Sequence, residues 1–258
     1  MDERSIGFVG GGRATTIFLG GLHRAGRLPR HIVVSDPSEA ALAALRRRVP
    51  GVEVTSDNEA AAACDVVVLA IHPPVIREIA GRLARRLRAE AAVISLAPKL
   101  TLANLAGLLG GFSRLARVIP NAPSIVGAGF NPVCVGPDAD EAMRRAVLDL
   151  LRPLGECPEV AEADLESYAI LTAMGPTYLW FQLYELIDLA TSFGLGREDA
   201  QRGLRAMVQG ALATMERSGL SAAEVMDLVA ARPLGDGEAP ILELYRSKLP
   251  ALLARLRP

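Results

Sequence analysis

Residues 5–22 read SIGFVGGGRATTIFLGGL, an apolar stretch that runs into a glycine turn and then into a helix-forming segment. Gly10, Gly12 and Thr15 stand at the three marked positions of a G-x-G-x-x-G pattern. In a strand–turn–helix unit, the first glycine permits the tight turn and the second lets a pyrophosphate approach the backbone. The helix that follows directs free N–H groups and its positive dipole end at the phosphates. The stretch therefore predicts a dinucleotide-binding loop.

Two features beside this loop bear on that prediction. Thr15 departs from the pattern, because the third position is usually a glycine or alanine that allows close packing of helix on strand. An ordinary glycine-rich turn is the alternative reading.

An acidic residue, Asp36, ends the next apolar run 24 residues after Gly12 and favours the cofactor loop. A carboxylate there accepts both ribose hydroxyls and repels a 2′-phosphate, so we expect NAD(H) in preference to NADP(H). The alternative role for Asp36 is to cap the following helix.

The first part of the chain alternates short apolar runs with helical patterns. The run DVVVLAI at residues 65–71 is nearly continuous, as expected of a parallel strand buried on both faces. Strands separated by helices imply right-handed crossovers and a doubly wound sheet. We therefore predict an α/β Rossmann-type domain over residues 1–160, with strands at 5–10, 32–35, 52–54, 65–71, 92–96, 117–119 and 133–136.

The pattern changes to helix alone after about residue 160, and we predict a helical domain over residues 161–258. One long helical pattern covers 165–192, with Gly175 and Pro176 breaking it, because proline removes a helix hydrogen bond. A second helix is predicted over 197–217, and Ser221 with Glu224 forms a capping box for a third. We expect a loop over 232–240 and a final helix. The 179–189 segment is apolar on several faces, which favours burial against a second subunit as a homodimer.

Composition excludes several classes of function. Lys and Arg total 28 and Asp and Glu total 29, so no bulk charge attracts nucleic acid. No run approaches the ~20 apolar residues of a membrane span, and a strand is predicted too close to the N-terminus for a signal peptide. Cys64, Cys134 and Cys157 show no metal or redox spacing, which favours a reducing, cytoplasmic setting without a bound metal.

Polar residues follow the predicted strands at the carboxyl edge of the sheet, where open α/β sheets bind ligands. His72 follows the fourth strand, and could act as an acid or only shape the pocket. Lys99 follows the fifth, and could pair with a substrate carboxylate or a phosphate, or be a solvated charge. Asn121 lies in a rigid loop between Pro120 and Pro123, and offers an amide donor and acceptor.

The run RVIPNAPSIVGAGFN at residues 117–131 resembles the R-x-M-P-N-T-P-x-x-V-G-x-G-x-T signature of the pyrroline-5-carboxylate reductase family. The amino-terminal GFVGGGRATTIFLGGL is similar to that family's cofactor loop, and LAIHPPVI to its LAVKPQ. The segment GPTYLWFQLYELIDLATSFGLGREDAQR resembles the start of its helical domain. The resemblance spans residues 5–230 in collinear order, and implies a Rossmann domain, a helical domain that interlocks into dimers, and NAD(P)H-dependent reduction of a cyclic imine to proline.

The resemblance and the motifs together give the candidate site residues. Candidates for the substrate cleft are Thr172, Met174, Gly175 and Tyr178. Candidates for cofactor binding follow the successive strands: Gly10, Gly12, Arg13, Ala14, Thr15, Asp36, Ala70, His72, Pro73, Ser95, Ala97, Asn121 and Pro123.

The chain departs from the family where the substrate is expected to bind. The family's S-P-G-G-T-T motif, whose threonines and amides hold the imine nitrogen and the carboxylate, is replaced by RPLGDGE at residues 232–238. Asp236 and Glu238 are unfavourable neighbours for a substrate carboxylate. Proline formation remains the first expectation for the substrate. A related imine or another specialised substrate, a keto substrate protonated by His72, and a cofactor-binding regulatory protein without catalysis are the alternatives.

Overall fold

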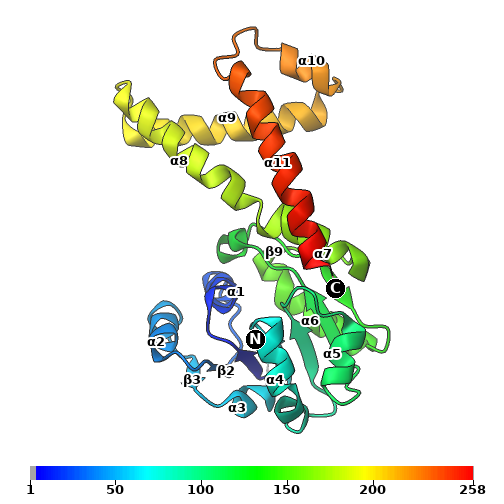
Figure 1. Ribbon diagram of the computed structural model, residues 1–258. Helices are drawn as coiled ribbons and strands as arrows, with labels where there is room; N and C mark the ends of the chain where they lie inside the picture. The colour runs from blue at the N-terminus through cyan, green and yellow to red at the C-terminus, as the bar shows by residue number, and fades with distance from the viewer. Residues whose placement is uncertain (1–3, 258) are drawn as a thin grey trace. The chain divides into compact units, whose positions relative to one another are not determined.

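The computed structural model describes residues 4–257 (Figure 1). Its contacts divide the chain into two compact units, one of the residues up to Met174 with those from Leu252 on, and one of Gly175–Ala251. The first unit holds the sheet and the second is helical.

The first unit is built on a seven-stranded sheet in the order β3-β2-β1-β4-β5-β6-β8. All strands but the last run parallel, and β8 pairs antiparallel with β6. The order reverses between β1 and β4, which is the topological switch point where ligands of such sheets bind. The strands are β1 (Ile6–Val9), β2 (Ile32–Ser35), β3 (Glu53–Thr55), β4 (Val66–Leu69), β5 (Ala92–Ser95), β6 (Leu115–Val118) and β8 (Val133–Val135). The predicted doubly wound sheet is confirmed, with an antiparallel edge that the sequence pattern does not reveal.

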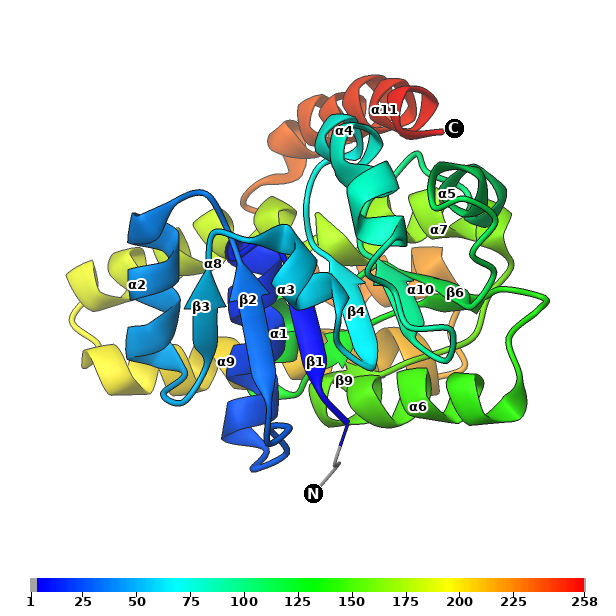
Figure 2. The same ribbon diagram turned by 90° about the horizontal axis from the view of Figure 1, so that it is seen from below.

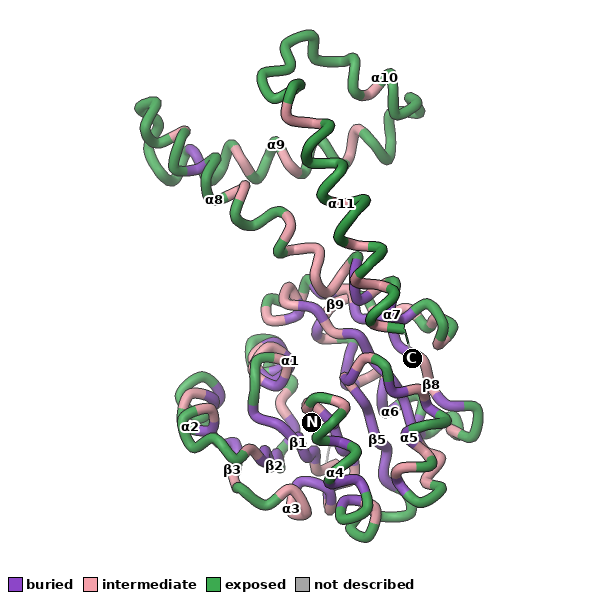
Figure 3. Tube along the Cα trace, in the orientation of Figure 1, coloured by how far each residue is buried: buried purple, intermediate pink, exposed green. Residues whose placement is uncertain are grey.

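Helices cover both faces of this sheet, so the central strands are buried on both sides (Figures 2 and 3). Phe8 packs edge-on against Phe18 on one face, in a core completed by α1, α2 and α6. Residues of α3, α4 and α5 form the core on the other face. The helices are α1 (Arg13–Arg24), α2 (Glu39–Arg48), α3 (Asn58–Ala62), α4 (Pro73–Ala84), α5 (Leu102–Leu108) and α6 (Glu141–Leu151).

Short elements lead from the sheet to the helical part of the chain. The strands β7 (Gly129–Phe130) and β9 (Gly155–Glu156) form a separate parallel pair. Three short turns of helix complete the sheet region: η1 (Ala122–Val126), η2 (Arg152–Leu154) and η3 (Glu162–Asp164). After η3, α7 (Leu165–Tyr168) widens into a π-helical segment, η4 (Ala169–Ala173). Such widened turns occur frequently at functional sites.

The second unit contains α8 (Pro176–Ser192), α9 (Arg197–Arg217), α10 (Ala222–Asp227) and most of α11 (Gly235–Leu256). The break before Pro176, the bounds of α9 and the capping box of Ser221 and Glu224 are confirmed. The prediction of a loop through Pro240 is wrong, because α11 starts at Gly235 and contains both Pro240 and Pro250. Pro240 is the sixth residue of α11 and Pro250 the sixteenth, so each removes one intrahelical hydrogen bond from this helix.

Candidate active site

The glycine loop joins β1 to α1 as predicted. Gly10 has φ +105°, and a Cβ there would lie 2.5 Å from the carbonyl oxygen of Ala70 after β4. Its N–H donates to Ser35 O at 2.7 Å, so the turn is fixed between two neighbouring strands. Any side chain at position 10 would therefore disrupt the fold itself.

Gly12 differs from Gly10 in its surroundings. It precedes α1, and a Cβ built on it meets no atom of the described chain within 4 Å. The space over the amino end of α1 is therefore open, and the first N–H groups of a helix have no intrahelical partners. An open cradle with unpaired N–H donors fits the pyrophosphate of a dinucleotide. Arg13 is exposed at this end, followed by the partly buried Ala14.

Thr15 is accommodated at the third position by a hydrogen bond. Its side chain is fully buried, and its hydroxyl donates to the carbonyl oxygen of Gly10. The hydroxyl is thereby satisfied within the loop, so the buried threonine is tolerated where glycine or alanine is usual.

Asp36 lies directly after β2 and is bonded to the same loop. One carboxylate oxygen accepts from Gly11 N–H at 2.7 Å and the other from Ser38 N–H at 2.8 Å. The cap of α2 is Ser38, whose hydroxyl accepts from Ala41 N–H at 3.3 Å. Asp36 is therefore held against the glycine loop and is not the helix cap. Each carboxylate oxygen retains a lone pair for a further donor.

The next two strands end beside this loop in the sheet order. After β4, Ala70 N–H donates to Val9 O at 2.8 Å, and the exposed His72 precedes α4, which begins at Pro73. At the end of β5, the fully buried Ser95 accepts from the N–H of the buried Ala97 at 3.3 Å. These candidates lie along one edge because adjacent parallel strands end there.

Lys99 has a left-handed backbone with φ +68°, and is the one non-glycine residue with positive φ among residues 4–257. A non-glycine residue in this conformation costs about 1–2 kcal/mol. Its N–H points to the Glu166 carboxylate at 3.4 Å. The turn after β5 is therefore strained and held by a buried acid.

The loop after β6 carries Asn121, which is 8% exposed. Its side-chain oxygen accepts from Phe130 N–H at 3.1 Å, and its amide donates to the carbonyl oxygen of Thr172 in η4 at 3.1 Å. Pro123 lies in the turn that follows, η1. A cofactor candidate and a substrate-cleft candidate are thus joined directly.

The remaining substrate-cleft candidates divide between the two units. Met174 ends the first unit, and its N–H donates to Ala169 O at 3.0 Å. Gly175 and Tyr178 belong to the second unit. The ring of Tyr178 lies 6.0 Å from that of Tyr245 in α11, and burial raises the pKa of its hydroxyl. Thr172 is therefore bonded to the carboxyl edge of the sheet through Asn121, whereas Gly175 and Tyr178 lie in the second unit.

A network of buried ion pairs joins β6 to η3 and α7. Arg117, in the middle of β6, is 1% exposed and pairs with Glu166 at 2.5 Å and Glu162 at 3.0 Å. Sequence reasoning missed both glutamates. The sequence signal for these acids was Arg117 itself, because an arginine within the buried strand LARV needs an acidic partner.

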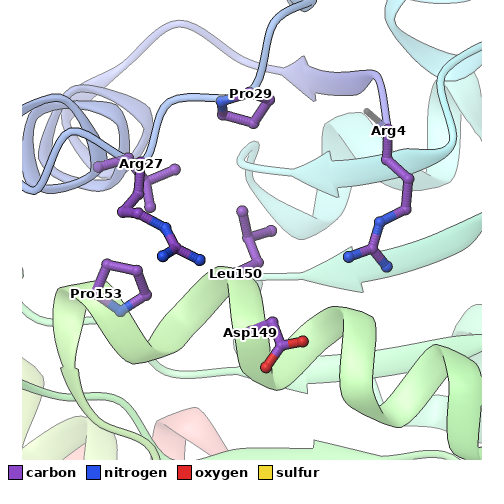
Figure 4. Close-up of a pocket in the computed structure, with 7 residues that line it drawn as sticks. Arg4, Arg27, Pro29, Asp149, Leu150 and Pro153 are labelled. Atoms are coloured by element: carbon purple, nitrogen blue, oxygen red, sulfur yellow. The ribbon is translucent and has the colours of Figure 1, made fainter. Parts of the chain in front are cut away.

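The first unit contains several cavities, among them one of about 580 Å³ beside Arg117, Glu162 and Glu166. Two others bear on the glycine loop and the opposite edge of the sheet. One, of about 410 Å³, lies between the glycine loop, α2 and Ile125, with Arg13 and Arg48 among its walls. The other, of about 250 Å³, lies at the opposite, amino-terminal edge of the strands. There Arg4 and Arg27 reach in from two sides above Leu150 (Figure 4). Of these two, the first adjoins the predicted cofactor loop and the second lies away from it.

Among residues 4–257, none of the helices is both long enough and apolar enough to cross a bilayer. Within the same range, no group of three or more His, Cys, Asp or Glu side chains could hold a metal ion.

Two family models match the chain. One, described as NADP oxidoreductase coenzyme F420-dependent, matches residues 5–99, and the other, pyrroline-5-carboxylate reductase dimerisation, matches residues 162–256. A curated pyrroline-5-carboxylate reductase of Corynebacterium melassecola is 30% identical over 246 residues, which cover 94% of this chain and 91% of that protein.

Solved structures show the same likeness. A pyrroline-5-carboxylate reductase from Coxiella burnetii is 28% identical with a TM-score of 0.74, over 99% of this chain and 98% of that one. The fold is also that of the Plasmodium falciparum pyrroline carboxylate reductase solved with NADP bound, at 21% identity and a TM-score of 0.76, over 99% of this chain and 95% of that one. Given this identity over nearly its whole length, the chain belongs to the pyrroline-5-carboxylate reductase family.

Proposed function

We propose that this protein reduces 1-pyrroline-5-carboxylate to proline with a reduced nicotinamide dinucleotide. The observation that carries the proposal is the collinear match of 30% identity to a curated pyrroline-5-carboxylate reductase over 94% of the chain. The open cradle at Gly12 supports it, because a dinucleotide needs such a backbone approach.

The cofactor supplies a hydride when bound, and the residues of the chain bind and orient the two reactants. We assign the pyrophosphate to the amino end of α1 and the adenosine ribose to Asp36. The residues that follow β4, β5 and β6 form the rest of the cofactor site: Ala70, His72, Pro73, Ser95, Ala97, Asn121 and Pro123. A protonated iminium already carries the proton on nitrogen and becomes the amine when its carbon accepts the hydride, so the chain need only orient it.

We propose that NADH is preferred to NADPH. Asp36 is fixed by Gly11 and Ser38 so that it cannot move away from the ribose without losing two hydrogen bonds. A 2′-phosphate would meet this carboxylate at close range, and like charges repel.

Reduction of a related imine without a carboxylate is the second candidate substrate, and the start of α11 favours it. Arg232 is engaged by both carboxylate oxygens of Glu238, at 2.9 and 3.1 Å, and Asp236 lies in the same first turn. These acids already complement the positive end of the helix dipole and would repel an anionic group. Thr172, Met174, Gly175 and Tyr178 stay our candidates for the substrate cleft.

We propose that residues 1–160 bind the dinucleotide and that residues 161–258 form the dimerisation and substrate domain of a homodimer. Large apolar side chains are exposed on α8 and just after it, including Phe181 at 68% and Phe193 at 79%. Exposed apolar surface of this extent marks an interface. Light scattering should give twice the chain mass of 27.3 kDa, and Phe181→Glu with Phe193→Glu should give the monomer.

Unpaired cysteines fit a cytoplasmic location.

The test of the activity follows loss of reduced-nicotinamide absorbance with 1-pyrroline-5-carboxylate and a panel of carboxylate-free cyclic imines. Turnover with the carboxylated substrate supports proline formation, and turnover with the others alone supports the second candidate. Cofactor binding without turnover of any imine would instead indicate a regulatory protein.

A further inference from the structure

The centre of the buried ion network is Arg117. Its two terminal nitrogens lie 2.5 Å from a carboxylate oxygen of Glu166 and 3.0 Å from one of Glu162. The side chains of Arg117 and Glu166 are 1% and 3% exposed. Burying a charge pair adds little stability compared with apolar residues of the same volume. Stability alone is therefore a weak explanation for this pair, and its contacts suggest a second role.

The same carboxylates also hold the turn that follows β5. The oxygen of Glu162 that meets Arg117 accepts from Leu102 N–H at 2.6 Å. The corresponding oxygen of Glu166 faces Lys99 N–H at 3.4 Å. The arginine, through two acids, thereby fixes both ends of the strained turn, at residues 99 and 102. This turn directly continues the Ser95–Ala97 part of the cofactor site.

The network also fixes the segment that carries the substrate-cleft candidate. Glu166 belongs to α7, which runs without interruption into the π-helical segment η4. Thr172 in that segment accepts from Asn121, four residues after Arg117 in the chain. Two connections, one through Glu166 and one through Asn121, therefore hold η4 to the end of β6.

We propose that Arg117 is a positioning residue for the reaction. Acting through Glu162 and Glu166, it holds the turn after β5 and the π-helical segment in register at the carboxyl edge of the sheet. Orientation of reacting groups is sensitive, and a displacement of about 1 Å can lower a rate about 100-fold. The kinetic test of this inference rests on the proposed reductase activity. The hydrogen-exchange test does not depend on that activity.

The first test variant combines Arg117→Met with Glu166→Leu, so that no unpaired charge stays buried. Amide hydrogen exchange should become at least about tenfold faster at residues 98–103 and 169–174, and stay unchanged in β1 and β4. With the imine that the wild type reduces, kcat should fall about 100-fold, while the Kd for the reduced cofactor changes less than about threefold, because the glycine loop is untouched.

Glu162→Ala is the second variant, since this side chain is 29% exposed and its loss leaves no buried charge without a partner. Exchange at Leu102 should become faster, and kcat should fall about tenfold, less than in the double variant. Arg117→Lys should restore part of the rate, because it keeps the charge but loses the two-armed contact. The control is Arg86→Met with Glu59→Leu, an exposed pair at 2.7 Å, which should change neither readout.

The proposal is overturned if the Glu162→Ala variant keeps both the wild-type amide exchange at residues 98–103 and 169–174 and the wild-type kcat. This outcome decides the question even if the double variant does not fold. If the wild type turns over no imine, the proposed function fails, and the exchange experiment alone decides whether Arg117 holds the two segments.

Discussion

The side-chain amide of Asn121 donates to the backbone carbonyl of Thr172 at 3.1 Å. This contact joins the loop after β6, a cofactor candidate, to the π-helical segment that carries a substrate candidate. The other end of the same amide accepts from Phe130 N–H, so the orientation of the group is fixed. One buried asparagine thus makes one of the two connections that hold these parts of the proposed site together.

Replacing Asn121 with aspartate should therefore disturb both parts. The change removes the donor, sets a carboxylate against a carbonyl oxygen at a position 8% exposed, and should cost about 1–3 kcal/mol of stability. We expect a fall in kcat of at least about tenfold, measured with the reduced cofactor saturating. Asn104→Asp, at an exposed position of α5, is the matched control and should leave both quantities unchanged. An Asn121→Asp enzyme with wild-type kcat would show that this contact does not align the site.

The glycine loop predicts two different outcomes for two alanine substitutions. Gly12→Ala should leave the melting temperature within about 2 °C, because the new Cβ meets no chain atom within 4 Å. It should raise the Kd for the reduced cofactor at least about tenfold, because the methyl group occupies the pyrophosphate approach.

Gly10→Ala should instead destabilise the fold by more than about 2 kcal/mol, because its Cβ would lie 2.5 Å from Ala70 O at φ +105°. Gly81→Ala in α4 has open space and serves as the control. Unchanged cofactor affinity in Gly12→Ala would contradict the assignment of this loop.

Asp36 should determine the choice between the two cofactors. Asp36→Asn removes the charge and keeps an acceptor oxygen for Gly11 N–H, so the ratio of kcat/KM with NADH to that with NADPH should fall at least about tenfold. Asp138→Asn, an equal charge change at an exposed site, should leave the ratio unaltered. A wild-type preference for NADPH would show that the carboxylate does not exclude the 2′-phosphate.

The sequence predicted the parallel sheet and its glycine loop because local signals are strong there. Each buried strand is an apolar run, and Gly10 is required by its own backbone angle. The bounds of α9 and the cap at Ser221 were likewise encoded by neighbouring residues. The strand predicted at 133–136 is confirmed as β8, but its antiparallel direction was not predicted, because it depends on a pairing with β6 that no local pattern specifies.

The candidate site likewise contains residues that the sequence predicted and residues that it did not. The positions of Asp36 and Asn121 at the carboxyl edge of the sheet were predicted from their places after strands. The acids Glu162 and Glu166 were missed, because their partner Arg117 is 45 and 49 residues away in sequence. The start of α11 at Gly235 was also missed, since glycine and proline there read as a loop.

Thiol reactivity gives a prediction that depends on pH. Burial raises the pKa of Cys157 to about 11, with a smaller opposing effect from the Asn131 side chain. The thiolate is the reactive form, so alkylation of Cys157 by iodoacetamide should rise with pH up to about 11. At pH 8 the rate should be at least about 100-fold below that of a free cysteine. Peptide mass spectrometry measures it, and the urea-unfolded protein is the control. Labelling at the free-cysteine rate in the folded protein would contradict the half-buried placement of Cys157.

The central claim is that the chain transfers a hydride to 1-pyrroline-5-carboxylate, and the stoichiometry of the products tests it most directly. With purified protein, NADH and this imine, we predict one proline formed for each NADH oxidised, and an equal fall in both rates on Gly12→Ala when NADH is limiting. NADH that binds but is not consumed, or is consumed without formation of proline, would contradict the account.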